Sequence, residues 1–218
     1  MRLSPILIAT ALSGVLASSV VIAQGPDKKR VRITYQNLTG GQAFSPSVFM
    51  SHNGSAPKLF AMGGKASPGL ARLAEDGNVA PIADMAGKMM GGAVGMSDIG
   101  LPTMPRKTGM VELTVSRNHP MVSGAWMLSM TNDGFTGING INAYAMRGPQ
   151  TIDVMAHDAG SEKNNERRPY LVALMGIARD PEAGVIARHA GIRGNADAPA
   201  AWKFDPARPV ARITITPL

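Results

Sequence analysis

The chain has 218 residues, with 22 Lys and Arg against 15 Asp and Glu, a formal net charge of +7 and no cysteine. The absence of cysteine excludes disulfide bonds, thiolate nucleophiles and cysteine-based zinc sites. Only 5% of the residues are aromatic while 15 are Met, so flexible thioether side chains must fill much of the core.

The first residues carry the pattern of an export signal. Arg2 supplies a positive start, residues 3–22 are largely apolar, and Ala23 places a small residue where a signal peptidase cleaves. We expect a signal peptide over residues 1–23, with Gln24 as the new N-terminus, and a secreted or periplasmic protein. The alternative is a retained membrane anchor, but serine and glycine interrupt the apolar run and no stop-transfer flank follows it.

The mature chain is predicted to form one domain. Removing the signal peptide leaves 195 residues and a net charge of +6, because Arg2 is the only charged residue lost. We expect an exposed basic lead-in over residues 24–30 and a single domain over 31–218. A basic protein outside the cytoplasm meets anionic lipid head groups or acidic polysaccharide sooner than nucleic acid. We therefore expect no nucleic-acid partner and no transmembrane span after cleavage.

The first predicted elements are extended. Residues 31–38 alternate apolar and polar side chains and are rich in β-branched residues, which is typical of a half-buried strand. Residues 39–42 then predict a turn. Residues 44–51 predict a second extended segment, because Pro46 disfavours a helical conformation at Ser45.

A helical insertion is predicted around residues 67–90. Apolar residues recur there at helical spacing in two runs, which 75–78 (Glu-Asp-Gly-Asn) separate, and these runs predict two short helices. Ser67 followed by Pro68 is typical of a helix N-cap with proline at the first helical position.

The remainder of the chain predicts mainly strands. The predicted strands and extended segments are 110–116, 125–130, a mixed segment over 138–146, 151–156 and 209–216. Residues 91–107 predict a loop, and 161–169 predict an exposed polar connection. Together these elements predict a mainly all-β fold, an antiparallel β-sandwich with a short helical insertion, in which the first and last strands pair.

Two short acidic segments are the main candidates for a functional site. Residues 131–135 (Thr-Asn-Asp-Gly-Phe) and 157–162 (His-Asp-Ala-Gly-Ser-Glu) are predicted loops, each following a run that predicts a strand. Two carboxylates on neighbouring strand ends, Asp133 and Asp158, suit a hard cation such as Ca²⁺, which prefers oxygen ligands. The further candidate ligands are the side-chain amide of Asn132, the carboxylate of Glu162 and the carbonyl of His157. Alternatively, each Asp only caps its own turn, a common role beside glycine.

Other chemistry has weaker support in the sequence. The four histidines, His52, His119, His157 and His189, lie too far apart to form a zinc spacing motif. A Ser-His-Asp triad can be written with His157 and Asp158, but no Gly-x-Ser-x-Gly motif presents a nucleophile. We therefore expect no enzyme activity and no catalytic residue.

A methionine-rich stretch offers one more metal hypothesis. Its members are Met85, Met89, Met90, Met96, Met104 and Met110. Thioethers select Cu(I), so a copper-binding periplasmic protein is an alternative function. The spacing of Met85 and Met89 also fits the buried stripe of a helix, which is the usual meaning of such spacing.

Several short motifs resemble one known family. They are residues 31–38 followed by 41–46, residues 66–70 with 73–77, residues 131–137, residues 158–162 and residues 209–214. In this order they are similar to the landmarks of the spondin N-terminal domain family in its bacterial form, through nearly all of the mature chain. The chain departs from the animal pattern, because it lacks cysteines and any attached repeat module.

The resemblance implies a β-sandwich, known from extracellular matrix adhesion proteins, with a metal ion, usually calcium, at one end. By match to the motifs, Asp133 and Asp158 would be the carboxylate ligands. We expect a secreted calcium-binding adhesion or surface-recognition module, whose binding loops the metal fixes and whose partner is an extracellular glycan or protein. The departures mean that matrix or integrin adhesion does not carry over. A structural envelope protein without a specific ligand is the alternative, and the sequence does not fix the oligomeric state.

Overall fold

The computed structural model describes residues 27–96 and 101–218. The predicted signal peptide, its cleavage site and the first three residues of the basic lead-in (24–26) lie outside these residues. Within them, no helix is both long and apolar enough to cross a membrane.

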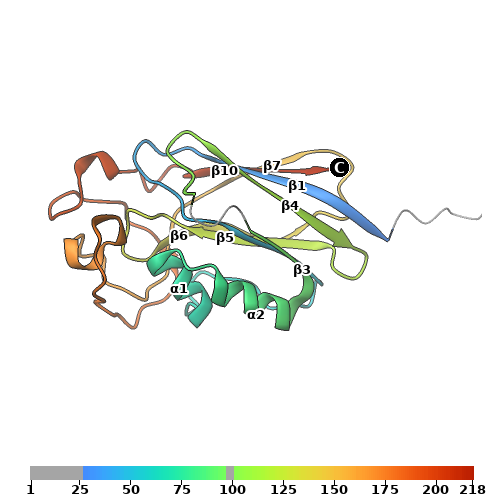
Figure 1. The fold of residues 1–218 in the computed structure, drawn as a ribbon, viewed down its shortest axis with the longest axis horizontal. Helices are drawn as coiled ribbons and strands as arrows, with labels where there is room; N and C mark the ends of the chain where they lie inside the picture. The colour runs from blue at the N-terminus through green and yellow to red at the C-terminus, as the bar shows by residue number, and fades with distance from the viewer. Residues whose placement is uncertain (1–26, 97–100) are drawn as a thin grey trace, which may run out of the picture.

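The described residues form two antiparallel sheets that pack face to face (Figure 1). One sheet has the strand order β4 (Thr108–Ser116), β1 (Lys28–Asn37), β10 (Ala211–Pro217) and β7 (Gln150–Val154). The other has the order β3 (Gly91–Met96), β2 (Val48–His52), β5 (Met121–Met127), β6 (Gly134–Asn142), β8 (His157–Asp158) and β9 (Ala187–Arg188). The predicted antiparallel β-sandwich is confirmed.

The first and last strands pair, as the sequence predicts. β1 and β10 are antiparallel, and Ile33 stands opposite Ile215. From Val31 onward every second side chain of β1 is buried, including Val31 and Ile33, while the neighbouring Arg30 and Arg32 are exposed. Because successive side chains of a strand point to opposite faces, the apolar set of β1 faces the second sheet.

Aromatic side chains fill the space between the two sheets. Trp126 of β5 is completely buried, and the centre of its ring lies 4.8 Å from that of Tyr35 and 5.8 Å from those of Phe44 and Phe49. Tyr35 belongs to the opposite sheet, so this cluster joins both layers. Aromatic pairs at such distances add to the stabilisation from buried area.

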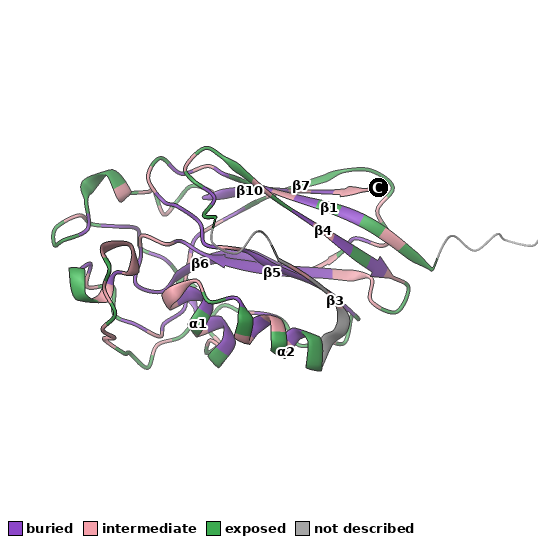
Figure 2. Ribbon diagram, viewed as in Figure 1, coloured by how far each residue is buried: buried purple, intermediate pink, exposed green. Residues whose placement is uncertain are grey.

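Two helices cover the outer face of the six-stranded sheet (Figures 1 and 2). They are α1 (Pro68–Asp76) and α2 (Ala80–Met90). The predicted N-cap is confirmed, because the Ser67 hydroxyl accepts a hydrogen bond from the Leu70 N–H at 3.2 Å. Leu70 and Ile82 are completely buried and pack with residues of the sheet in a second core. Three short 3-10 helices, η1 (Arg168–Tyr170), η2 (Val172–Leu174) and η3 (Ala200–Trp202), lie in the later loops.

Three local predictions differ from the structure. The predicted loop at 91–107 begins with strand β3, because this glycine-rich segment obtains backbone partners from β2. β1 begins at Lys28, so the end of the basic lead-in belongs to the sheet. The connection at 161–169 is not exposed throughout, since Glu162 and Glu166 are buried by partners from distant parts of the chain.

Replacing Trp126 with alanine is expected to lower the free energy of unfolding by about 3–5 kcal/mol, because it empties the centre of the inter-sheet core. Urea unfolding followed by circular dichroism measures this loss. Trp202→Ala is the matched control, because Trp202 is only partly buried and packs in a smaller cluster. Equal losses for the two variants would contradict the central role of Trp126.

Candidate metal centre

Asp133 and Asp158 come together at one end of the six-stranded sheet. β6 begins at Gly134, directly after Asp133, and Gly134 stands opposite Asp158 of β8. The N–H of Ala159 donates to the carbonyl of Asp133 at 3.2 Å. Antiparallel pairing of β6 with β8 therefore brings the two aspartates to neighbouring chain segments. Asp158 itself lies in a strand, not in a loop as the sequence predicts.

The carboxylate of Asp133 ties the second acidic segment to the first. Its Oδ2 accepts hydrogen bonds from the N–H of Ser161 at 2.8 Å, the N–H of Glu162 at 3.0 Å and the Ser161 hydroxyl at 3.3 Å. These donors belong to the second acidic segment, 28 and 29 residues along the chain, so Asp133 does more than cap its own turn. Its other oxygen, Oδ1, is buried and has no hydrogen-bond partner.

The surroundings of Asp133 disfavour its charged form. Burial is the largest cause, followed by the negative charge of Asp158, and together they raise the pKa of Asp133 from 3.8 to about 7. The hydrogen bonds from Glu162 and Ser161 act in the opposite direction but do not compensate. A cation beside Oδ1 would offset both effects, because its charge stabilises the carboxylate.

The oxygens of Asp158 are already used within the chain. Oδ1 accepts from the N–H of Gly160 at 2.7 Å, which is the turn-capping role of an aspartate, and Oδ2 accepts from the side-chain amide of Asn164. Asp158 is therefore placed to act on Asp133 by its charge. Asp158 can bind an ion together with Asp133 only if one of its oxygens contacts the ion as well as its present donor, or if Oδ2 gives up its hydrogen bond from Asn164.

The side chain of Glu162 pairs with a guanidinium group. Its side chain is completely buried, and its Oε1 lies 3.2 Å from Nε of Arg179. Arg179 also contacts Asp76 and Glu75 of α1, at 3.0 Å and 3.6 Å. Burial raises the pKa of Glu162 to about 7, although Arg179 acts to lower it. Glu162 thus belongs to an ion-pair cluster that joins this loop to α1.

Asn132 and His157 are also committed to other contacts. Asn132 is buried, and its amide lies within 3.4 Å of Asn165 Oδ1 and the Tyr170 carbonyl. The His157 ring lies against Phe60 and Phe135, with centroids 5.3 Å and 5.4 Å away. Burial, and then the charge of Arg188, lower the pKa of His157.

The strand geometry also excludes the triad written with His157 and Asp158. These two residues are consecutive in β8, so their side chains point to opposite faces of the sheet. A histidine and an aspartate placed in this way cannot share a hydrogen bond as triad partners do.

These contacts define how well a calcium ion fits. No group of three or more His, Cys, Asp or Glu side chains in the described chain is arranged to hold a metal ion. Calcium, however, also takes backbone carbonyl, amide and water oxygens. The free, buried Oδ1 of Asp133 beside the charge of Asp158 fits one such ion. Glu162 pairs with Arg179 and the Asn132 amide lies near Asn165 and Tyr170, whereas the carbonyl of His157 stays a predicted ligand.

Two buried residues of this region carry no signal in the sequence. Glu166 accepts hydrogen bonds from the N–H groups of Arg193 and Gly194, at 2.5 Å and 2.7 Å, and so fixes a distant loop. His189 is buried, its Nδ1 accepts from Gly191 N–H at 3.0 Å, and its Nε2 has no partner. The sequence gives an isolated Glu and an isolated His, and neither pattern reveals these distant contacts.

The described methionine side chains do not gather into one copper-binding site. Met85 packs against the helix-side core, whereas Met104 and Met110 are exposed. The side chains of Met89, Met90 and Met96 lie outside those that the structure describes.

The raised pKa values predict how stability depends on pH without metal. Asp133 and Glu162 rise from 3.8 and 4.5 to about 7 on folding, so the folded protein holds protons that the unfolded chain releases. The corresponding stability is complete below about pH 4 and is lost as the pH rises through about 7. Urea unfolding in chelator at about pH 5 and about pH 8 measures this loss.

Asp133→Asn should reduce that loss, because an amide does not ionise while its oxygen can still accept from Ser161 and Glu162. Asp153→Asn is the control, because Asp153 is exposed and the pKa of its carboxyl is already lowered by Arg212. If Asp133→Asn loses as much stability as the wild type between the two pH values, the buried carboxyl is not the cause.

The sequence matches no protein-family model, and a comparison with curated proteins also gives no match. The resemblance to spondin N-terminal domains therefore rests on the short motifs and stays a prediction.

Proposed function

We propose that this chain is a secreted or periplasmic calcium-binding β-sandwich of the spondin type, which serves in adhesion or surface recognition. The observation that carries the proposal is the carboxylate of Asp133, completely buried, beside the charge of Asp158 and with Oδ1 unpartnered. Asp133 and Asp158 would hold the ion, with backbone carbonyl and water oxygens completing the shell. The bound ion would neutralise the negative charges of these two carboxylates.

The proposed role of the ion is to fix the end of the sandwich. Asp133 precedes β6 and binds the backbone of Ser161 and Glu162, so a fixed Asp133 carboxylate also fixes the segment after β8. Loops carried on a rigid sheet are the usual places for binding residues. The ion would thus hold a recognition surface in one conformation.

A shallow pocket lies beside this segment and suits a polar partner. It has a volume of about 200 Å³, and its lining includes Lys65, Ser161 and Glu182 with backbone of 159–160 and 183–184. Lys65 and Glu182 offer opposite charges, and the backbone and hydroxyl groups offer hydrogen bonds. Ser161 both binds Asp133 and lines the pocket, so the proposed ion and the pocket share one residue. A glycan or a polar peptide fits this lining.

The second candidate is a structural envelope protein without a specific ligand. It is favoured by hydrogen bonds that already satisfy the two aspartates: Ser161 and Glu162 donate to Asp133 and join the two acidic segments, while Gly160 and Asn164 donate to Asp158 within the second segment and its flank. In that case the ion adds stability only, and the pocket takes no specific partner.

Calcium is expected to raise the melting temperature of the protein in a concentration-dependent way above about pH 7, because a ligand that binds only the folded state stabilises it. Isothermal titration calorimetry and thermal melts measure binding and stabilisation together. Asp133→Ala should abolish both effects and Asp158→Ala should weaken them. Asp153→Ala, which removes an exposed partner of Arg212, should leave calcium binding unchanged. Calcium binding by Asp133→Ala equal to the wild type would refute the site.

Surface recognition is expected to require the ion. In a screen against immobilised extracellular glycans and proteins, binding by the wild type should disappear with chelator and in Asp133→Ala, while Asp153→Ala still binds. Partners whose binding is unaffected by chelator and by Asp133→Ala would reject the recognition role. Calcium stabilisation without any bound partner would favour the structural alternative.

A further inference from the structure

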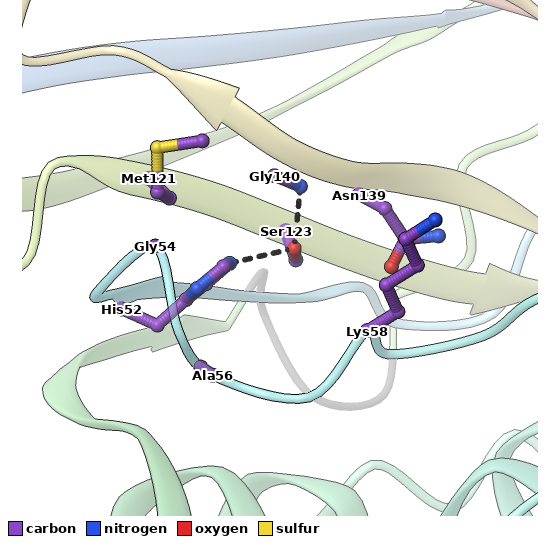
Figure 3. A pocket seen from close by; sticks show the side chains of 8 residues that line it. All are labelled: His52, Gly54, Ala56, Lys58, Met121, Ser123, Asn139 and Gly140. Carbon is purple, nitrogen blue, oxygen red and sulfur yellow. Dashed lines mark hydrogen bonds between the residues drawn. The ribbon is translucent and has the colours of Figure 1, made fainter.

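A serine and a histidine on neighbouring strands share a hydrogen bond at a pocket that contains no residue of the acidic segments (Figure 3). His52 ends β2 and stands opposite Met121 of β5, two residues before Ser123, so both side chains lie on one face of the sheet. His52 Nε2 lies 2.8 Å from the Ser123 hydroxyl oxygen. Both residues are buried.

The neighbours of this pair fix the direction of the hydrogen bond. His52 Nδ1 lies 2.8 Å from the carbonyl oxygen of Asn53, which can only accept, so Nδ1 carries a hydrogen. In the neutral ring Nε2 is then an acceptor, and the Ser123 hydroxyl must donate to it. The N–H of Gly140 donates to the same serine oxygen at 2.8 Å. The serine proton thus points at Nε2 of His52, and the Asn53 carbonyl sets the tautomer of this histidine.

The backbone around Ser123 is distorted where this arrangement occurs. The register of β5 and β6 shifts between Val122 and Gly124, so Ser123 stands opposite both Asn139 and Gly140. Gly140 has φ +62°, a conformation that favours glycine. The pairing of β2 with β3 is also irregular between Met50 and His52. β-Bulges re-aim side chains and are frequent beside active sites.

The pocket gives a small molecule access to the pair. Its volume is about 230 Å³, and Ala56 and Met121 supply apolar lining. Asn139 and Lys58 also line it, and in Figure 3 they lie on the other side of Ser123 from His52. Lys58 is exposed, so its ammonium group gives the rim a positive charge. This combination suits a small acyl group attached to an anionic or polar alcohol.

We propose that Ser123 and His52 form a nucleophile and general-base pair that accepts an acyl group from a small ester. The Ser123 oxygen attacks the ester carbonyl carbon while its proton passes to His52 Nε2. The carbon–oxygen bond to the alcohol then breaks, and the proton on His52 goes to the departing alkoxide. A water molecule then gives a proton to His52 and attacks the acyl carbon. The bond from that carbon to the Ser123 oxygen breaks, the acid leaves, and His52 returns the proton to the serine oxygen. The Lys58 ammonium group is the donor at the pocket for the transient negative oxygen, while the N–H of Gly140 stays on the serine oxygen.

A serine-directed fluorophosphonate probe tests the proposal. The Ser123 oxygen should displace fluoride from phosphorus, and mass spectrometry of the digested protein should find the adduct at Ser123. Ser123→Ala should abolish this adduct. His52→Gln, which can keep a hydrogen bond but is no base, should label about 100-fold more slowly, a loss typical of removing general-base assistance. Hydrolysis of p-nitrophenyl acetate should fall in both variants.

The chain offers a matched control in a second serine beside a histidine. Ser116, the last residue of β4, has its Oγ 3.5 Å from Nδ1 of His119. Neither residue lines the pocket of Ser123, so Ser116→Ala should leave labelling and hydrolysis unchanged. Chelator should also change nothing, because this site shares no residue with the acidic segments. This independence separates failure here from failure of the calcium proposal.

If His52→Gln does not fold, the pH dependence of labelling in the wild type tests whether a general base assists Ser123. In the wild type the labelling rate should level off with rising pH and not follow the hydroxide concentration, because a side chain and not hydroxide takes the serine proton. A wild type unlabelled at Ser123, a folded His52→Gln that labels as fast as the wild type, or a rate that rises tenfold per pH unit throughout would overturn the proposal.

Discussion

The cross-segment hydrogen bonds of one buried carboxylate hold the end of the sandwich together. Asp133 Oδ2 receives three donors from Ser161 and Glu162, which lie far along the chain. The same contacts place Ser161 at the adjoining pocket and turn Glu162 toward Arg179. The placement of that pocket and of the ion pairs with α1 therefore depends on Asp133, whether or not an ion occupies its second oxygen.

The ion pairs beyond Asp133 explain how a charged loop stays attached to the helical layer. Arg179 and Arg72 both contact Asp76, and Arg179 also contacts Glu75 and Glu162. Breaking a buried pair by removing one partner leaves an uncompensated charge, which is more costly than the loss of an exposed pair. Arg179 is thus the link between the loop after β8 and the end of α1, whereas the exposed pair of Lys88 and Asp84 contributes little.

Elements defined by local patterns were predictable, and contacts between distant segments were not. The alternation in β1 and β10 and the N-cap at Ser67 are local signals, and each is confirmed. β3 lacks alternation, so only its pairing with β2 reveals it as a strand. In the candidate site the sequence selects Asp133 and Asp158, which the fold brings together. It does not predict the burial of Glu166, because the donors at Arg193 and Gly194 are far away in sequence.

The short strand β9 has a consequence for how the chain behaves among its own copies. The outer strand of the six-stranded sheet on that side spans only Ala187 and Arg188, both exposed. A long unpaired border would be a template for another chain to extend the sheet by backbone hydrogen bonds. The two residues of β9, one of them cationic, offer an incoming strand very few backbone groups for hydrogen bonding. This side of the molecule therefore resists the edge-to-edge growth that leads to fibrils.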